Sequence, residues 1–253
     1  MNARAQHSIV NRFKRDLSWY YRRLADRHKH TDREVPKEEI FRFLPASAIV
    51  IEAGAFNGAD TEEMSRLWPK ATIHAIEPLP HAYEQLVLRA GFRKNVHSYC
   101  LALSDKSGVT TMYVSEGDAS GGDQSSSILS PKEVLERLPK IRFDRQIKVP
   151  VHSVPDFMVQ QGIGQVDLLW LDLQGAEFSV LCAAAPVLPQ VSAIYMEVYQ
   201  IEAYEGVTLY PEVREWLSIH GFRVEREGRF WAMSGNVLFV NERKFSLQGN
   251  SMS

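Results

Sequence analysis

The sequence predicts an α/β fold of the Rossmann-like kind, with a seven-stranded, mostly parallel sheet and helices on both of its faces. Two observations support this prediction. From residue 48 onward, apolar runs of strand length alternate with stretches of helical length, which is typical of parallel strands covered on both sides. A glycine-containing loop directly follows the first apolar run, at the position where open α/β sheets bind their ligands.

The expected elements alternate from one end of this region to the other. Strands are predicted at 48–51, 72–76, 96–103, 108–114, 146–151, 167–171, 193–197, 222–226 and 236–240. Helices are predicted at 38–44, 60–67, 80–90, 131–138, 156–161, 176–185 and 210–220. Asp60 and Glu63 have the spacing of a capping box, which would make Asp60 the N-cap of its helix. Residues 115–130 are rich in Gly, Ser and Asp and predict a mobile loop that closes over a substrate.

The chain is expected to divide into a helical N-terminal extension (1–45), one main domain (46–245) and a flexible tail (246–253). Apolar residues between Ile9 and Leu24 recur at helical spacing, and the first thirty residues are strongly basic. An amphipathic helix that docks or joins two copies into a homodimer is one interpretation. A surface for anionic lipid or polysaccharide is the other.

Composition limits the function classes. With 45% hydrophobic and 24% charged residues the chain is an ordinary globular protein. It lacks an apolar run of about 20 residues and a secretory signal, so no membrane span is expected. Cys100 and Cys182 each lie in an apolar run, which favours core packing and a cytoplasmic location. The region after the basic N-terminus is acidic, which argues against nucleic acid as a partner.

The loop after the first strand has features of a nucleoside site. It reads Glu52-Ala-Gly-Ala-Phe-Asn-Gly58, in which Gly54 allows a tight turn and Gly58 allows close approach to the next helix. The second strand ends in Glu77, whose carboxylate can accept hydrogen bonds from both ribose hydroxyls. Glycines with an acid at the next strand end indicate a nucleoside ligand.

The loop departs from the nicotinamide fingerprint. That fingerprint has a second glycine two residues after the first, where this chain has Phe56. The following helix opens with acidic residues, which discourage a bound phosphate. S-adenosylmethionine (SAM) carries no phosphate and has a positively charged sulfonium, so it suits this loop better.

Five segments in order resemble the FkbM family of SAM-dependent methyltransferases. They are Ile51-Glu-Ala-Gly-Ala-Phe-Asn-Gly58 with Thr61, Ala75-Ile-Glu-Pro-Leu-Pro80, Ala102-Leu-Ser-Asp105 with Gly108, Ser125-Ser-Ser-Ile-Leu129, and Leu171-Asp-Leu-Gln-Gly-Ala-Glu177. Glu52 stands where the family usually has Asp, and Gln174 stands where it has Glu. The resemblance implies a class I methyltransferase fold and a SAM-dependent enzyme (EC 2.1.1.-) that yields S-adenosylhomocysteine.

The resemblance also implies roles for individual residues. The methionine end of SAM would lie against Glu52, Gly54, Ala55, Asn57 and Gly58. Glu77 and Pro78 would hold the ribose. Residues Ala102, Leu103, Ser104 and Asp105 would contact the adenine, and Asp172 would lie near the methyl group. The implied acceptor is a hydroxyl of a sugar, a glycan or a polyketide-like molecule.

Methyl transfer to a hydroxyl benefits from a base that removes the proton. Asp172 is the first candidate and His152 the second; an N-cap or other structural role is the alternative for Asp172. The expected acceptor-binding residues are Ser125, Ser126, Ser127, Gln174, Glu177, Glu197 and Tyr199. Tyr195 and Tyr204 are further candidates for the lining of the acceptor pocket, because aromatic faces suit sugar rings, with core packing as the alternative for these tyrosines. No metal ligands are assigned, although Asp172, Glu177 and Glu197 together offer the oxygen ligands that Mg²⁺ prefers.

Two other functions remain open at this point. One is an NAD-dependent oxidoreductase on the same kind of sheet, against which Phe56 argues. The other is a non-catalytic nucleoside-binding scaffold that uses the basic N-terminal helix for interaction.

Overall fold

The protein is described by a computed structural model covering residues 34–117, 122–231 and 233–244. Its central feature is a seven-stranded sheet. In spatial order the strands are β3 (Val96–Tyr99), β2 (Thr72–Ile76), β1 (Ile49–Ala53), β7 (Leu168–Leu171), β8 (Ala193–Tyr199), β10 (Ser234–Asn241) and β9 (Phe222–Glu227). Strand β10 is antiparallel to both of its neighbours, whereas the first five strands run parallel. This is the α/β class I methyltransferase architecture that the sequence predicts.

Helices cover both faces of this sheet. Three of them share a core with one face: α2 (Lys37–Phe41), α3 (Ala59–Leu67) and α4 (Pro80–Ala90). Three others pack on the opposite face: α6 (Val154–Gln161), α7 (Glu177–Ala183) and α8 (Tyr210–Ile219). The central strand β7 is buried along its whole length, because helices lie on both sides of it. This two-sided burial explains its uninterrupted apolar sequence.

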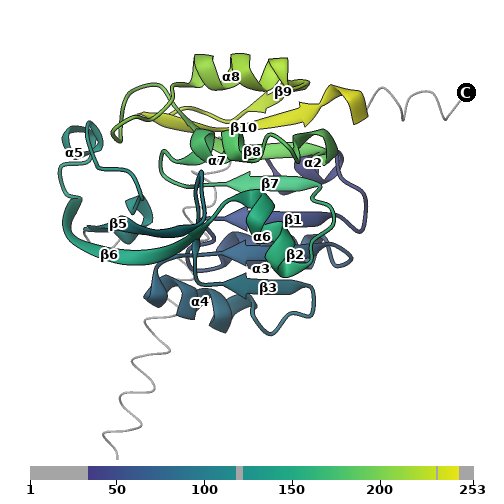
Figure 1. Ribbon diagram of the computed structural model, residues 1–253, viewed down its shortest axis with the longest axis horizontal. Helices are drawn as coiled ribbons and strands as arrows, with labels where there is room; N and C mark the ends of the chain where they lie inside the picture. Colours follow the sequence, from purple (N-terminus) through teal and green to yellow (C-terminus); the bar gives the residue numbers. More distant parts are fainter. Residues whose placement is uncertain (1–33, 118–121, 232, 245–253) are drawn as a thin grey trace, which may run out of the picture.

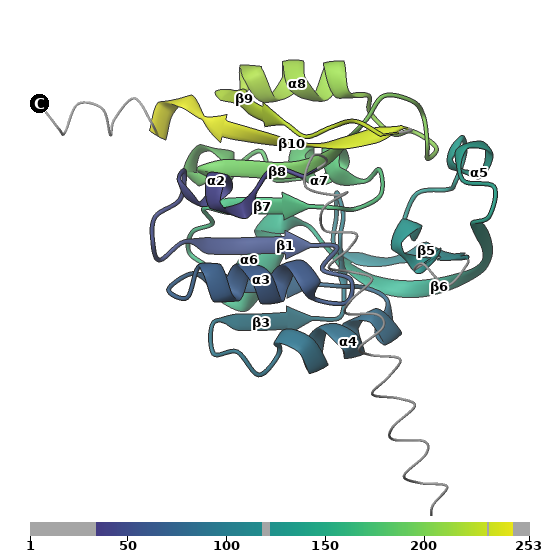
Figure 2. The same ribbon diagram turned by 180° about the vertical axis from the view of Figure 1, so that it is seen from behind.

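A second sheet projects beyond the carboxyl ends of the first (Figures 1 and 2). It contains β4 (Ala102–Leu103), β6 (Arg142–His152) and β5 (Gly108–Glu116), in that order, and the short helices η1 (Gly122–Ser125) and α5 (Val134–Arg137) lie in the connection between β5 and β6. The prediction of a single strand at 96–103 is therefore wrong. This segment divides into β3 and β4, which belong to different sheets.

The start of α3 also differs from expectation. Gly58, with a φ of 75°, is the N-cap, and no side chain caps the helix. Asp60 lies inside the first turn, where its carboxylate accepts a hydrogen bond from the buried Lys37 at 2.8 Å. The predicted capping box is wrong because this long-range ion pair uses the Asp60 side chain. Glu63 contacts the same ammonium at 3.2 Å.

Some expectations fall outside the described residues. The basic helix predicted near the N-terminus, its proposed role in homodimer formation and the tail after residue 245 all lie there. Within the three described ranges, no helix is long and apolar enough to cross a membrane.

Candidate active site

The predicted cofactor loop follows β1 at the carboxyl edge of the sheet, next to the ends of β2 and β7. The amides of Gly54 and Ala55 both donate to the Ile76 carbonyl at 3.0 Å, which fastens the loop to the end of β2. Gly54 has a φ of 85°, and a Cβ atom there would lie 1.9 Å from the backbone oxygen of Asp172. The glycine is therefore needed because two strand ends approach each other closely.

Glu77 connects the two loops that follow β1 and β2. Its carboxylate accepts the Phe56 amide and the Leu79 amide, each at 2.8 Å. Phe56 adopts a positive φ of 47°, which turns its N–H toward this acid. A carboxylate has about four acceptor positions, so one carboxylate can hold several donors at once. Glu77 is thus a buried acid whose two oxygens hold the backbone of both loops.

Glu52 is buried on β1 immediately before the loop. Its Oε2 accepts a hydrogen bond from Thr61 Oγ1 at 2.6 Å. Desolvation by burial raises the pKa of Glu52 to about 8, and nearby Asp60 adds to that effect. At neutral pH the carboxyl group is therefore largely protonated in the folded chain.

The other loop residues are held by neighbouring elements. Asn57 accepts a hydrogen bond from Arg89 of α4 at 2.8 Å. Gly58 packs so closely on Leu86 that a Cβ would lie 2.8 Å from that side chain. Pro78 is buried next to Glu77. The loop is therefore a tightly packed junction between β1, α3 and α4.

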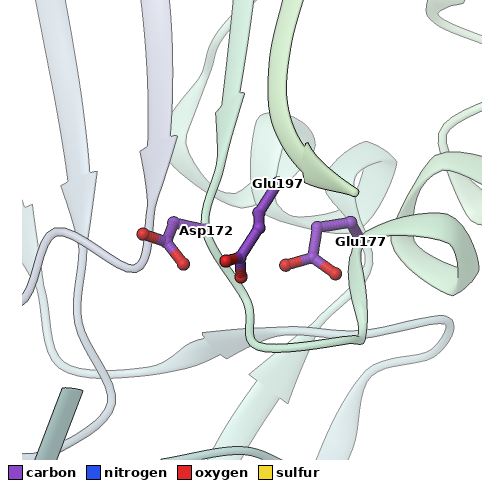
Figure 3. Close-up of side chains that lie close together, drawn as sticks. All are labelled: Asp172, Glu177 and Glu197. Atoms are coloured by element: carbon purple, nitrogen blue, oxygen red, sulfur yellow. The ribbon is translucent and has the colours of Figure 1, made fainter. Parts of the chain in front are cut away.

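Three carboxylates meet at the adjoining ends of β7 and β8. Asp172 follows β7, Glu177 begins α7 and Glu197 lies in β8, with ligand atoms within 4.8 Å of one another. In Figure 3 the Glu197 carboxylate lies between those of the other two. The strands that carry Asp172 and Glu197 were predicted to end near the same crevice, so their acids were expected to converge. The structure brings them together.

This crowding changes the acidity of all three groups. Asp172 is exposed by surface area, yet the protein packed around its carboxylate, and then the charge of Glu197, raise its pKa to about 8. Burial and the charge of Glu197 likewise raise the pKa of Glu177 well above its ordinary value. Burial also raises the pKa of Glu197. The cluster therefore retains protons near neutral pH.

Donors from the protein already satisfy much of this cluster. The amides of Leu173 and Gly175 donate to Glu177 at 2.7 and 3.0 Å. The Tyr199 hydroxyl and Ser234 Oγ donate to Glu197, the latter at 2.7 Å. These bonds occupy acceptor positions of Glu177 and Glu197 with neutral protein donors, so the hydrogen bonding lends no support to the Mg²⁺ alternative.

Gln174 joins two of the acids. Its Nε2 lies 2.7 Å from Asp172 Oδ1 and 3.1 Å from Glu197 Oε2. Asp172 itself does not cap α7, because that helix has Ala176 as its N-cap and no side-chain cap bond. The N-cap alternative for Asp172 is therefore wrong.

The second candidate base lies elsewhere. His152 ends β6 opposite Leu103 of β4, and its carbonyl accepts the Ser104 amide at 2.9 Å. Within the described ranges the carboxylate cluster consists of Asp172, Glu177 and Glu197, so His152 is not a member of it. Ala102 and Leu103 are buried in hydrophobic cores, whereas Asp105 is exposed and accepts a bond from Ser104 Oγ at 3.0 Å. His152 thus adjoins the predicted adenine segment and is separate from the acids.

The Ser-rich segment is packed into the protein at its second half. Ser126 and Ser127 are buried. Ser126 Oγ accepts the Ser115 amide at 2.9 Å, and Ser127 Oγ donates to the Gln174 carbonyl at 2.7 Å. Both hydroxyls therefore have structural partners. Ser125 is half-buried, and its carbonyl accepts the Tyr204 hydroxyl at 2.9 Å.

Two further residues belong to the site: Tyr204, which was a candidate for the lining of the acceptor pocket, and Ser234, which was not predicted. Tyr204 is buried, and its hydroxyl lies 3.1 Å from Gln174 Oε1. Ser234 reaches Glu197 because β10 pairs with β8 in antiparallel register, Ser234 opposite Tyr199. Antiparallel register is not readable from local sequence, so only a predicted pairing of the last strand with β8 would have revealed Ser234.

Comparison with known proteins identifies the family. The model of the methyltransferase FkbM domain matches residues 52–224. The 2-O-methyltransferase NoeI of Sinorhizobium fredii (strain NBRC 101917 / NGR234) is 32% identical over 160 residues, which are 62% of this chain and 66% of NoeI, just under two thirds of that protein. The methyltransferase sdnD of Sordaria araneosa is 26% identical over 211 residues, covering 75% of this chain and 79% of sdnD.

Solved structures show more distant similarity. A fibrillarin pre-rRNA processing protein of Methanococcus jannaschii has a TM-score of 0.47 and 13% identity, covering 78% of this chain and 67% of that one. A SAM-dependent methyltransferase of Aquifex aeolicus has a TM-score of 0.45 and 14% identity, covering 84% and 92%. The family match spans most of the chain and argues against the two alternative functions, an NAD-dependent oxidoreductase and a non-catalytic scaffold. The chain belongs to the methyltransferase FkbM-domain family.

Proposed function

We propose that the protein transfers the methyl group of SAM to a hydroxyl of a sugar, a glycan or a polyketide-like acceptor. The observation that carries this proposal is the carboxylate of the exposed residue Asp172 at the carboxyl edge of the sheet, beside the cofactor loop and within a cluster of acids. A carboxylate suits the removal of a hydroxyl proton. The similarity to a 2-O-methyltransferase supports oxygen as the receiving atom.

The residues around the loop fit SAM by their chemistry. Glu77 follows β2 beside the cofactor loop, and its carboxylate is the proposed acceptor of hydrogen bonds from the two ribose hydroxyls. The acids Glu52 and Asp172 flank the loop and suit a cationic ligand, since a positive charge nearby favours the ionised form of a carboxyl group. Ala102, Leu103, Ser104 and Asp105 remain the proposed adenine contacts. Gly54, Ala55, Asn57, Gly58 and Pro78 shape the remainder of the site.

Asp172 is the proposed general base of the reaction. SAM supplies a methyl group bound to a positively charged sulfur. The acceptor oxygen forms a bond to the methyl carbon while the carbon–sulfur bond breaks, and the bonding pair stays on sulfur. The hydroxyl proton passes to a carboxylate oxygen of Asp172, which requires an ionised Asp172 at the start.

The proposed acceptor site lies beside the acid cluster. Ser125, Glu177, Glu197 and Tyr199 surround it, and Tyr204 joins them. Glu177 and Glu197 favour an uncharged polyol over a phosphorylated or carboxylated acceptor, because a further anion beside the cluster would oppose the ionisation that Asp172 needs as a base. Ser126 and Ser127 contribute through the backbone that their hydroxyls hold in place.

Methyl transfer from labelled SAM tests this function. A panel of free sugars, methyl glycosides, oligosaccharides and polyketide-like alcohols is incubated with the protein, and products are analysed by mass spectrometry and NMR. The expected product is a methyl ether, with uronic acids and sugar phosphates as poor acceptors. Label found only on nitrogen or carbon would contradict the proposal.

A further inference from the structure

Gln174 holds a position that a simple acceptor-binding residue does not require. A primary amide has two N–H donors. Nε2 lies within hydrogen-bond distance of both Asp172 and Glu197, at 2.7 and 3.1 Å, so one N–H is available for each acid. Oε1 lies 3.1 Å from the Tyr204 hydroxyl and accepts a hydrogen bond from it. The amide oxygen therefore faces Tyr204, and the amide nitrogen faces the acids.

The backbone at Gln174 is also unusual. Its φ is 53°, in the left-handed region that residues other than glycine seldom adopt. The turn is held on both sides. Leu173 and Gly175 donate their amides to Glu177, and the Gln174 carbonyl accepts Ser127 Oγ at 2.7 Å. This arrangement directs the amide side chain into the space between two carboxylates.

The charges around Asp172 explain why a donor matters there. Glu197 of β8, Glu177 of α7, Asp60 of α3 and Glu34 just before α2 all act on this cluster with negative charge. Burial, then Glu197, and further Asp60 and Glu34 raise the pKa of Asp172, whereas the hydrogen bond from Gln174 lowers it. The tyrosine hydroxyls of Tyr199 and Tyr204 face the cluster as neutral groups.

We propose that Gln174 is a positioning residue that bridges Asp172 and Glu197 and keeps Asp172 able to accept the acceptor's proton. The inference rests on the proposed role of Asp172 as the base. The bridge holds two mutually repelling carboxylates at a fixed separation and offsets part of their repulsion. It also ties this geometry to the Ser-rich segment, because Ser127 and Tyr204 contact Gln174 from the other side.

The experiment measures the Asp172 carboxyl group directly, without an acceptor. The protein is labelled with ¹³C at aspartate carboxyl carbons, and the Asp172 resonance is assigned by its loss in Asp172→Asn. Gln174→Met keeps the length of the side chain and removes both donors. We expect the titration midpoint of Asp172 to rise by about one pH unit, a tenfold fall in its acid dissociation constant.

A matched control lies at the other end of the same strand. Gln165 Nε2 donates to Asp167 Oδ1 at 2.8 Å, next to the amino end of β7. Gln165→Met removes a comparable glutamine–aspartate bond, and we expect it to leave the Asp172 midpoint unchanged. Gln174→Glu is a second variant of nearly identical shape. It adds a carboxyl group to the cluster, so the midpoint should rise here as well.

The outcomes separate this inference from the proposed function. An Asp172 midpoint that stays at its wild-type value in a folded Gln174→Met or Gln174→Glu protein would overturn the positioning role, while Asp172 could still be the base. Methyl transfer that persists in Asp172→Asn would overturn the base assignment, whatever the titration shows. An equal rise in Gln165→Met would mean that the shift is unspecific, and it would also overturn the inference.

Discussion

At the scale of single residues, Asp172 combines solvent access with a raised pKa. A general base must be ionised, so the rate should follow the ionisation of this carboxyl group. We expect kcat/KM to rise with pH through an acidic limb near the pKa of about 8. Asp172→Asn should lower kcat by about 100-fold or more, within the range for loss of a general base.

Two measurements check this prediction. Initial rates between pH 6 and pH 10 (chosen to span about two units on either side of the pKa) define the limb, and calorimetry measures SAM binding to Asp172→Asn. Intact SAM affinity with lost turnover fits a base. A pH-independent rate between those limits would contradict the assignment.

Glu77 is the second residue with a separable role. Glu77→Gln replaces one acceptor oxygen by an amide N–H₂, which then faces the Phe56 or the Leu79 amide. The ribose would also lose a charged acceptor. We expect affinity for SAM and for S-adenosylhomocysteine to fall together by about tenfold or more, since both contain the ribose.

The control for Glu77 is Glu84→Gln, an exposed residue of α4. It removes the same charge without touching the loops. If Glu77→Gln binds both nucleosides as tightly as Glu84→Gln does, Glu77 does not contact the ribose.

Some features of the site residues could be predicted from the sequence, and others could not. The acids at 172, 177 and 197 were predicted to share one site because adjacent parallel strands end at one edge, and their ligand atoms lie within 4.8 Å. The bridging role of Gln174 was not predicted. It depends on a left-handed turn and on side-chain directions that sequence patterns do not specify.

At the scale of elements, the strand ends depend on glycine at position 54. In Gly54→Ala the new Cβ would lie 1.9 Å from the Asp172 carbonyl oxygen, at a φ of 85°. Either the loop or the end of β7 must move. We expect a loss of unfolding free energy of roughly 2 kcal/mol or more, by overpacking and backbone strain together, and a matching loss of SAM binding.

Chemical denaturation and SAM titration of Gly54→Ala measure these effects. Gly164→Ala is the control, because nothing lies within 4 Å of a Cβ at that position. A Gly54→Ala protein as stable as the Gly164→Ala protein would show that the close approach is not required.

Elements with local signals were predicted well. The strand at 72–76 and the helix at 80–90 have the bounds of β2 and α4, because apolar periodicity and a proline at the helix start are local features. The strand expected at 96–103 was wrong because β4 pairs with β6, about fifty residues later. Pairing over such a separation leaves no trace in a short window of sequence.

At the scale of the whole molecule, buried acids with raised pKa values should make stability depend on pH. Glu52 is 1% exposed, and its pKa of about 8 contrasts with an ordinary value of 4.5. Between these values the folded chain binds a proton that the unfolded chain releases. The free energy of unfolding therefore falls as pH rises through this window and levels off above about pH 8.

Glu52→Gln isolates the contribution of Glu52 to this dependence. The amide oxygen can still accept the Thr61 hydroxyl, but the side chain no longer ionises. We expect the variant and the wild type to differ little near pH 4.5, since Glu52 is protonated in the folded chain and only half ionised in the unfolded chain there. The variant should become more stable by roughly 3–5 kcal/mol near pH 8, where ionising the buried carboxyl group costs the wild type the most.

Guanidinium unfolding of the cofactor-free protein at several pH values measures the difference. The acids of the Asp172 cluster should also lower the free energy of unfolding as pH rises, because their pKa values are raised as well. They are present in both proteins, so their contributions cancel in the comparison. Glu38→Gln, at an exposed position of α2, controls for the loss of one negative charge. A stability difference that stays constant with pH would mean that Glu52 is already ionised in the folded chain, and the acid before the cofactor loop would then face SAM as a charge.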